Sequence, residues 1–350
     1  GSPCVPEVRR PCAMFNFLNW AAPAPLAGTA SGEDALEQSC GAARARGSGD
    51  RARRHRENEK DFTWRSLVTD TYGVLWKLII RPPRSTYIVE DLGPERFRLG
   101  SKSFQRKDLQ LTNQRGLRLE CSHFMPLDLE KESRRLPCVI YLHGNCSSRL
   151  EAIDTLFVLL PQGLSVFCLD LSGSGLSEGE YISLGWYEQQ DLEAAVNYLR
   201  GLHYVSGIGL WGRSMGASTS VLGAAADKSL GAMVMDSPFG SLPVVAQELV
   251  NRQMVQVPSF ILSMAMQTVR EEIQARARFD IQELQPIRAA PRARSPALFI
   301  VASDDDFVLP HHTYDLHRVW GGNERKLVTV TGGHNAARPK EVLQEAAEFL

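Results

Sequence analysis

A serine stands between two glycines in the segment Gly-Arg-Ser-Met-Gly at residues 212–216. The apolar, β-rich residues 208–211 come directly before it, and a stretch with helix-compatible apolar residues comes directly after it. A Gly-x-Ser-x-Gly sequence between a strand and a helix predicts a sharp, strained turn that presents the hydroxyl group at the end of a sheet. A side chain at either glycine would collide with the adjoining strand or helix. Ser214 is therefore predicted to be a nucleophile in acyl transfer.

A serine nucleophile needs a base to take its proton and an acid to orient that base. Both residue types follow in the sequence, each just past a predicted strand: Asp305 follows residues 297–301, and His334 follows residues 326–330. Open parallel sheets build their sites at these strand ends. Asp305 is predicted to hold the imidazole of His334, which takes the proton of Ser214.

The acid has two alternatives. Residues 304–306 are three consecutive aspartates, and we prefer Asp305 because the phrase Asp-x-x-Val-x-Pro that begins there fits an acid loop. Asp306 is the second choice. Asp236, at the end of the predicted strand 232–235, is the third, although its Asp-Ser-Pro sequence is also a common way to begin a turn.

Acyl transfer also needs backbone N–H groups that bind the oxyanion of the intermediate. The segment His143-Gly144-Asn145-Cys146 directly follows the predicted strand 138–142 and fits a loop that supplies one such donor. We favour the amide of Asn145, with Cys146 as the alternative, and expect His143 to be structural. The second predicted donor is the amide of Met215, which follows the serine.

No metal or cofactor is expected. His311 and His312 follow the three aspartates closely, but neighbouring ligands in one loop lack the spacing of known metal sites. The segment Gly173-Ser174-Gly175 is similar to part of a dinucleotide-binding loop, yet the spacing to a third glycine is wrong, and a tight loop at a strand end is predicted instead.

The elements that must position these residues alternate along the chain. Residues 108–112 and 117–124 predict a hairpin, and six further β-rich runs predict buried parallel strands, with helical patterns between most of them. These runs are residues 138–142, 165–169, 208–211, 232–235, 297–301 and 326–330. Apolar residues 192, 195, 196 and 199 mark one connecting helix. We expect an α/β fold with a mostly parallel, doubly wound sheet and helices on both faces.

The chain divides into two parts. Residues 1–60 are rich in Arg, Ala and Gly and predict a disordered extension, whereas residues 61–350 predict one domain with a cap insertion at about 240–292. Residues 64–80 predict an amphipathic helix, for which docking on the domain is favoured over weak contact with a membrane surface.

Charge and cysteine content limit the partners. With 39 basic and 40 acidic residues, the chain lacks the positive field of a nucleic-acid binder. Seven cysteines without paired spacing favour a reducing compartment, so we expect a cytoplasmic protein. The sequence gives no indication of oligomeric state.

From about Leu75 to its end, the sequence resembles the α/β-hydrolase superfamily and, within it, the serine-aminopeptidase-like (S33) hydrolases of plants, algae and protists. The phrases that carry the resemblance are Ile80-Arg81-Pro82-Pro83-Arg84, Tyr141-Leu142-His143-Gly144-Asn145, Asp170-Leu171-Ser172-Gly173-Ser174-Gly175-Leu176-Ser177, Leu210-Trp211-Gly212-Arg213-Ser214-Met215-Gly216 and Gly333-His334-Asn335. This resemblance implies a triad of Ser214, Asp305 and His334 with no cofactor, acting on a small-molecule or acylated substrate.

The expected function is therefore hydrolysis of an ester, thioester or amide. The rival interpretation is a ligand receptor or scaffold that keeps the fold without meaningful turnover. The apolar residues of the predicted cap favour an acyl substrate, whereas Arg213 and the cap residues Arg270, Arg276 and Arg278 would suit a carboxylate. The sequence does not decide between these two.

Overall fold

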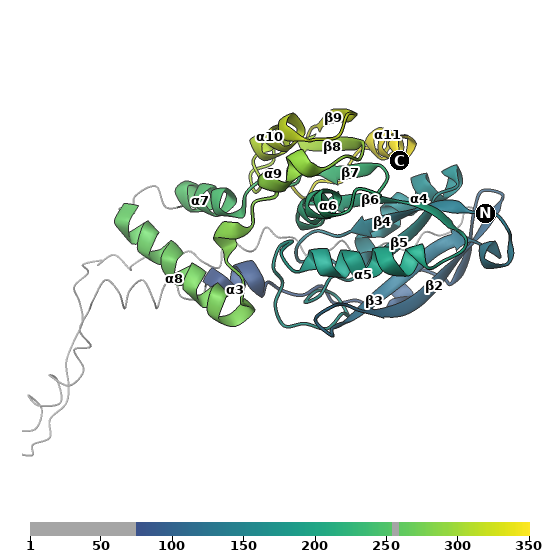
Figure 1. Ribbon diagram of the computed structural model, residues 1–350, viewed down its shortest axis with the longest axis horizontal. Coiled ribbons are helices and arrows are strands. Elements are labelled where there is room, and N and C mark those ends of the chain that lie inside the picture. Colours follow the sequence, from purple (N-terminus) through teal and green to yellow (C-terminus); the bar gives the residue numbers. More distant parts are fainter. Residues whose placement is uncertain (1–74, 254–258) are drawn as a thin grey trace, which may run out of the picture.

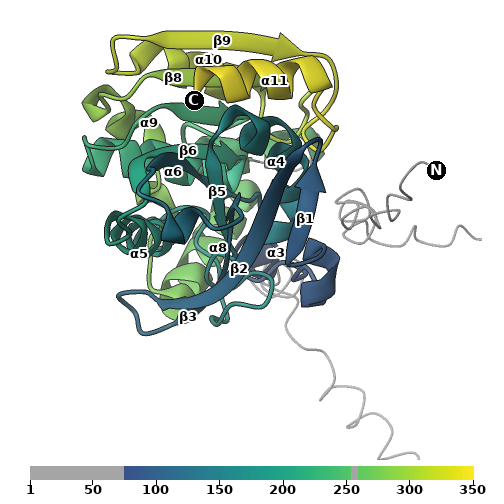
Figure 2. The same ribbon diagram turned by 90° about the vertical axis from the view of Figure 1, so that its right-hand side faces the viewer.

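The computed structural model describes residues 75–253 and 259–350. Its centre is a nine-stranded sheet with the order β1-β2-β3-β5-β4-β6-β7-β8-β9 (Figures 1 and 2). The strands β1 to β3 and the pair β3·β5 are antiparallel, and every pair from β5 to β9 is parallel. The predicted extension 1–60, with its basic cluster, lies outside the described residues.

The antiparallel part begins with β1 (Arg96–Leu99), which the sequence did not indicate, and continues with the predicted hairpin β2 (Lys102–Thr112) and β3 (Arg118–Pro126). The hairpin turn is closed by Asn113, whose side-chain oxygen accepts the backbone N–H groups of Arg115 and Leu117. Gly116 has a φ of 76°, a left-handed conformation that glycine adopts without strain.

All six predicted parallel strands are present: β4 (Leu136–Leu142), β5 (Ser165–Leu169), β6 (Val205–Arg213), β7 (Met233–Asp236), β8 (Ala297–Ala302) and β9 (Arg325–Val330). Apart from Ser165 and Asp236 at strand ends, β4, β5, β7 and β8 are continuous apolar runs, because both faces of the sheet are covered. Successive side chains point to opposite faces, so Ile140 lies in one core cluster and its neighbours Val139 and Tyr141 lie in the other.

Helices cover both faces, as the sequence predicts. One face carries α5 (Glu188–Arg200), α6 (Met215–Ala226) and α10 (Pro310–Val319), and the other carries α4 (Ile153–Leu159) and α11 (Lys340–Phe349). The predicted apolar stripe of α5 is buried. This is a doubly wound α/β architecture. Because β4, β6, β8 and β9 run parallel, the loops that follow them lie at the same edge of the sheet.

The segment between β7 and β8 holds the helices of the expected cap: α7 (Leu242–Gln253), α8 (Ser259–Ala277) and the single turn α9 (Pro286–Ala289). In the cap, Val269 is buried, whereas Phe260 is 56% exposed. Figure 1 shows α8 beside α3 (Leu75–Ile80), the described end of the predicted helix 64–80.

Two α3 side chains, Trp76 and Ile80, are buried in the domain core, so this part of the predicted helix docks on the domain. The guanidinium of Arg276 in α8 lies 4.1 Å from the centroid of a Trp76 ring. Residues 64–74 lie outside the description. Within the described chain, no helix combines the length and apolarity needed to cross a bilayer.

Candidate active site

Ser214 lies at the turn between β6 and α6, with backbone angles φ 50° and ψ −114°. This left-handed φ is costly for a residue with a side chain, and the surroundings hold it in place. A Cβ on Gly212 would lie 2.4 Å from the Gly216 carbonyl oxygen, and one on Gly216 would lie 2.0 Å from the Leu142 carbonyl oxygen of β4. Both glycines therefore allow the backbone contacts that create the turn.

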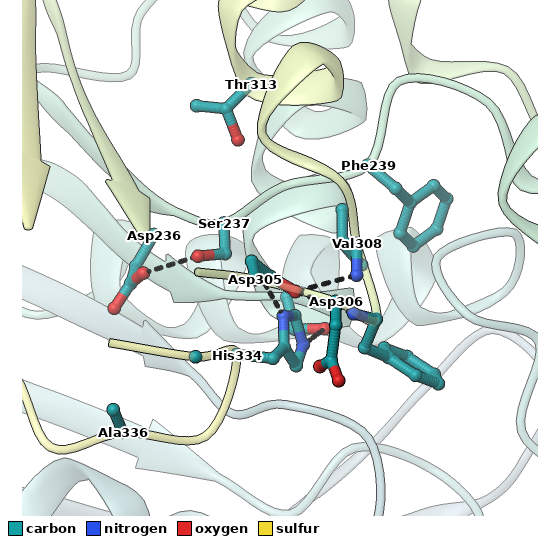
Figure 3. Close-up of polar contacts among 12 residues, drawn as sticks. Asp236, Ser237, Phe239, Asp305, Asp306, Val308, Thr313, His334 and Ala336 are labelled. Carbon is teal, nitrogen blue, oxygen red and sulfur yellow. Dashed lines mark hydrogen bonds and ion pairs between the residues drawn. The ribbon is translucent and has the colours of Figure 1, made fainter. Parts of the chain in front are cut away.

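The side chains of Ser214, His334 and Asp305 form a continuous chain of contacts. Figure 3 shows His334 beside Asp305. His334 Nε2 lies 2.8 Å from Ser214 Oγ, and His334 Nδ1 lies 2.6 Å from Asp305 Oδ2. The second carboxylate oxygen of Asp305 accepts the N–H groups of Phe307 and Val308, at 3.0 and 2.8 Å. All three side chains are largely buried. An imidazole held in this way directs its other nitrogen at the hydroxyl group.

The two alternative acids have other partners. Asp236 forms a buried ion pair with Arg338 at 2.8 Å, and Figure 3 shows its carboxylate turned toward Ser237 rather than toward His334. Asp306 is exposed, unlike the buried Asp305 and His334, and its backbone carbonyl accepts a hydrogen bond from Arg252 of α7. Of the candidate acids, Asp305 is the one whose carboxylate contacts the imidazole.

The loop after β4 passes beside the serine. A Cβ on Gly144 would lie 3.8 Å from Ser214 Cβ, while the Gly144 N–H donates to Glu151 Oε2 at 2.9 Å. The Cys146 N–H donates to the side-chain oxygen of Asn145 at 2.8 Å, so this amide is already engaged. The Asn145 amide thus remains the better candidate of the two for binding an oxyanion.

Met215 is the first residue of α6, and the first N–H groups of a helix have no partner within the helix. Its amide follows directly after the serine and adds the positive end of the helix dipole. His143 contacts the backbone instead: its Nε2 accepts the Leu171 N–H at 3.0 Å, and its Nδ1 lies 2.7 Å from the Gly144 oxygen. Nδ1 therefore carries the proton, and the ring fixes the loop, as expected of a structural histidine.

Three of the four predicted carboxylate-binding arginines are engaged within the chain, whereas the fourth, Arg278, is exposed. Arg270 pairs with Asp280, and Arg276 pairs with Glu272. Arg213 pairs with Glu151 and donates to two backbone carbonyls. These contacts favour structural roles over recognition of a substrate carboxylate.

The two histidines of α10, His311 and His312, contact the carboxylate of Glu248 in α7 rather than the aspartates at 304–306. His311 Nε2 and His312 Nε2 lie 2.6 and 3.1 Å from the two Glu248 oxygens, close enough to resemble a metal site. However, the Gly240 N–H points at His312 Nδ1 over 3.3 Å, which places the His312 proton on Nε2. A protonated nitrogen offers no lone pair to a metal, so this cluster is a hydrogen-bonded contact between α7 and α10.

Sequence reasoning missed three residues around the site. The ring of Phe307 packs against that of His334 at a tilt of 50°, with centroids 5.2 Å apart. Glu151 and Arg338 bind loops that carry site residues. Phe307 lies within the Asp-x-x-Val-x-Pro segment that carries the acid, so its position alone could have suggested a place beside the site. Glu151 binds Gly144, 7 positions away, and Arg338 binds Asp236, 102 positions away; no local pattern indicates either contact.

Comparisons with known proteins agree with this architecture. Residues 115–320 match the X-Pro dipeptidyl-peptidase (S15) family. The curated "Uncharacterized protein YqkD" of Bacillus subtilis (strain 168) is 29% identical over 200 residues, which are 56% of this chain and 64% of that protein. The chain thus spans less than two thirds of that relative's length.

Two groups of solved esterases share the fold. The Pyrococcus furiosus esterase Pf2001 is 22% identical, with a TM-score of 0.57 over 76% of this chain and 96% of that one. Acetyl xylan esterase 1 from Thermoanaerobacterium sp. JW/SL YS485 is 18% identical, with a TM-score of 0.55 over 80% and 92%. The family match covers more than half of the residues, so the chain belongs to the X-Pro dipeptidyl-peptidase (S15) family, a family of hydrolases, and has the α/β-hydrolase fold.

Proposed function

We propose that the protein is a serine hydrolase that cleaves an ester, thioester or amide through an acyl-enzyme on Ser214. The observation that supports this most is the unbroken contact from Asp305 through both nitrogens of His334 to the Ser214 hydroxyl. A hydroxyl group alone is a weak nucleophile at neutral pH, and a hydrogen-bonded imidazole removes its proton as it attacks. The strained turn presents this hydroxyl group at the end of the sheet.

In the first half of the reaction, Ser214 Oγ attacks the carbonyl carbon of the substrate while its proton moves to His334 Nε2. Asp305 stabilises the resulting imidazolium and keeps Nδ1 protonated. The oxyanion of the tetrahedral intermediate accepts hydrogen bonds from the amides of Met215 and Asn145. The intermediate then collapses, the leaving group takes the proton from Nε2, and the acyl group stays on Oγ.

In the second half, a water molecule gives a proton to His334 Nε2 and attacks the acyl carbon. The new intermediate releases the carboxylic acid as Ser214 Oγ takes back its proton. Each oxyanion donor removed from such a site typically costs about 100- to 1,000-fold in kcat. Two preformed backbone donors are therefore a large part of the rate enhancement that we assign to this site.

Turnover of three substrate classes tests the proposal. The names of the structural neighbours point to esters, and the family name points to X-Pro amides, so p-nitrophenyl acetate and octanoate, an acyl thioester and Gly-Pro-p-nitroanilide form a suitable set. Turnover of at least one of them should disappear in Ser214→Ala, together with labelling by a fluorophosphonate probe. Equal rates and equal labelling in both proteins would overturn the proposal and favour the ligand receptor or scaffold.

Several finer expectations from the sequence belong to the same proposal. Kinship with the S33-like branch rests on the sequence phrases around His143, Ser214 and His334. A cytoplasmic location is supported by Cys121 and Cys138, buried thiols outside any disulfide. The partner we propose is a small-molecule or acylated substrate rather than a nucleic acid. Weak membrane-surface contact through residues 64–80 could not use Trp76 or Ile80, because both side chains are buried in the domain.

A further inference from the structure

The loop that carries His334 joins β9 to α11 and has little regular structure of its own. Its second and third residues are glycines, and Gly332 has a φ of 119°. Glycine gives the backbone more freedom than any other residue, so a histidine on such a loop needs contacts that tie the loop to the rest of the domain. At the start of the loop, Gly332 and Asp304 exchange two hydrogen bonds, at 2.9 and 3.1 Å. The support for its remainder comes from two arginines.

Arg338 is the first of them, and its side chain is only 4% exposed. Its Nε and Nη2 donate to the two oxygens of Asp236, each over 2.8 Å, in a bidentate pair at the end of β7. The same guanidinium donates to the carbonyl oxygens of Gly333, His334 and Ala336, over 3.3, 3.3 and 3.0 Å. One rigid group therefore fastens three carbonyls of the loop to a buried carboxylate in the sheet.

Arg213 is the second, and it directly precedes the serine. Its Nη2 donates to the carbonyls of His334 and Ala336 over 3.0 and 3.2 Å, which are two of the three carbonyls that Arg338 binds. Its Nη1 lies 3.5 Å from Glu151 Oε1, while the other Glu151 oxygen accepts the N–H of Gly144. Arg213 thus connects the serine turn with the loop after β4 and with the histidine loop.

We propose that Arg213 and Arg338 are positioning residues: together they clamp the carbonyl oxygens of His334 and Ala336 and hold the imidazole against Ser214. This inference rests on the proposed function, because it assigns to the arginines the task of keeping the proton acceptor in place. In the unfolded chain these carbonyls bind water, and in the folded protein two cations replace it. Asp236 and Glu151 balance the two positive charges at the site.

The charges around Arg213 agree with this arrangement. Burial favours the neutral form of its guanidinium, but the carboxylates of Glu151 and Asp236 outweigh it and raise the pKa of Arg213. Arg213 therefore acts as a fixed cation. The planar, five-donor geometry of arginine is what allows one side chain to bind a carboxylate and several carbonyls at once, and lysine cannot reproduce it.

The decisive variants are Arg338→Lys and Arg213→Lys, which keep the charge and remove the planar fork. Removing the charge altogether would leave Asp236 buried without a partner and could unfold the protein. Arg106→Lys is the matched control: the Arg106 side chain is also 4% exposed, pairs with Asp108 at 3.0 Å and donates to a backbone carbonyl, but it lies on β2. Each variant is measured for kcat, KM and thermal stability.

We expect Arg338→Lys to lower kcat by about 10- to 100-fold, since displacing a catalytic group by about 1 Å can cost 100-fold. KM should stay within about threefold, because the arginines do not touch substrate. Arg106→Lys should lose comparable stability with unchanged kcat. The double variant Arg213→Lys/Arg338→Lys should lose less than the product of the single losses, because the arginines share two acceptors.

A readout without turnover completes the test. The proton between His334 Nδ1 and Asp305 should give a downfield NMR signal in the wild type that weakens or broadens in Arg338→Lys and persists in Arg106→Lys. Suppose that Arg338→Lys keeps both the wild-type kcat and this signal while its stability falls as in the control. The inference that the arginines position His334 is then wrong. If the wild type shows no Ser214-dependent turnover, the proposed function fails instead. The NMR comparison alone then decides whether the two arginines position His334.

Discussion

Replacing Gly216 by alanine would place a methyl group inside the contact between α6 and β4. The new Cβ would lie 2.0 Å from the Leu142 carbonyl oxygen and 2.8 Å from that of His143, whereas ordinary contacts begin at 3.4 Å. Both obstacles are backbone atoms, one at the end of β4 and one in the loop that follows it, so no rotamer change relieves them. The start of α6 must move away from β4 by more than an ångström, and Ser214 moves with it.

The size of the effect follows from this displacement. A shift of about 1 Å in a catalytic group can lower the rate about 100-fold, and overpacking a core typically costs about 1–3 kcal/mol of unfolding free energy. We therefore expect Gly216→Ala to remain folded, with kcat/KM reduced at least about 100-fold. Initial rates on the best ester substrate and thermal unfolding measure the two quantities separately.

Gly223→Ala, on the same helix, is the control. Its Cβ would lie 2.5 Å from Leu192 Cδ2, the end of a flexible side chain, and its next neighbour is 3.8 Å away. This variant should lose similar stability but keep its activity within a few-fold. Equal activity of Gly216→Ala and wild type would refute the inference that the approach of α6 to β4 positions the serine.

Two further variants examine the acid and the core. Asp305→Asn should lower kcat by about 10,000-fold, because the amide imposes the wrong tautomer on the imidazole. Asp306→Asn should change kcat less than tenfold. Similar losses in the two variants would contradict the assignment of Asp305 as the acid. His123 is fully buried on β3, and burial lowers its pKa from 6.5 to about 4. Between these pH values the unfolded chain binds a proton that the native chain does not, so wild type should lose up to about 3 kcal/mol of unfolding free energy as the pH falls from 7 to 4. Urea unfolding of His123→Phe should lack this loss, and equal losses in both proteins would rule the explanation out.

The positions that the sequence located well are those with local causes. A strand, a turn with two glycines and a helix indicate Ser214 without knowledge of the rest of the fold, and the strand ends indicate Asp305 and His334. The strands themselves are apolar runs, which report burial on both faces. The preference for the Asn145 amide over that of Cys146 comes from the sequence, and the folded loop adds one hydrogen bond, from the Cys146 N–H to the Asn145 side chain, that is consistent with it.

The features that the sequence did not reveal depend on contacts between distant segments. Arg338 and Asp236 are 102 positions apart, and neither residue has a neighbour that indicates an ion pair. Asp236 was a candidate acid because it ends a strand, but the position of Arg338 decides its role. The strand β1 was missed because its four residues alternate between exposed and half-buried and carry a weak apolar pattern.

The most direct test of the central claim is the site of covalent acylation. Acid quenching during turnover of a p-nitrophenyl ester, followed by tryptic digestion, should leave the acyl mass on the peptide that runs from Ser214 to Lys228, because trypsin cleaves after Arg213. His334→Ala should reduce the rate at which this adduct forms, and Ser214→Ala should abolish it. An acyl group found on another residue, such as Cys146, or turnover that persists in Ser214→Ala, would contradict the account.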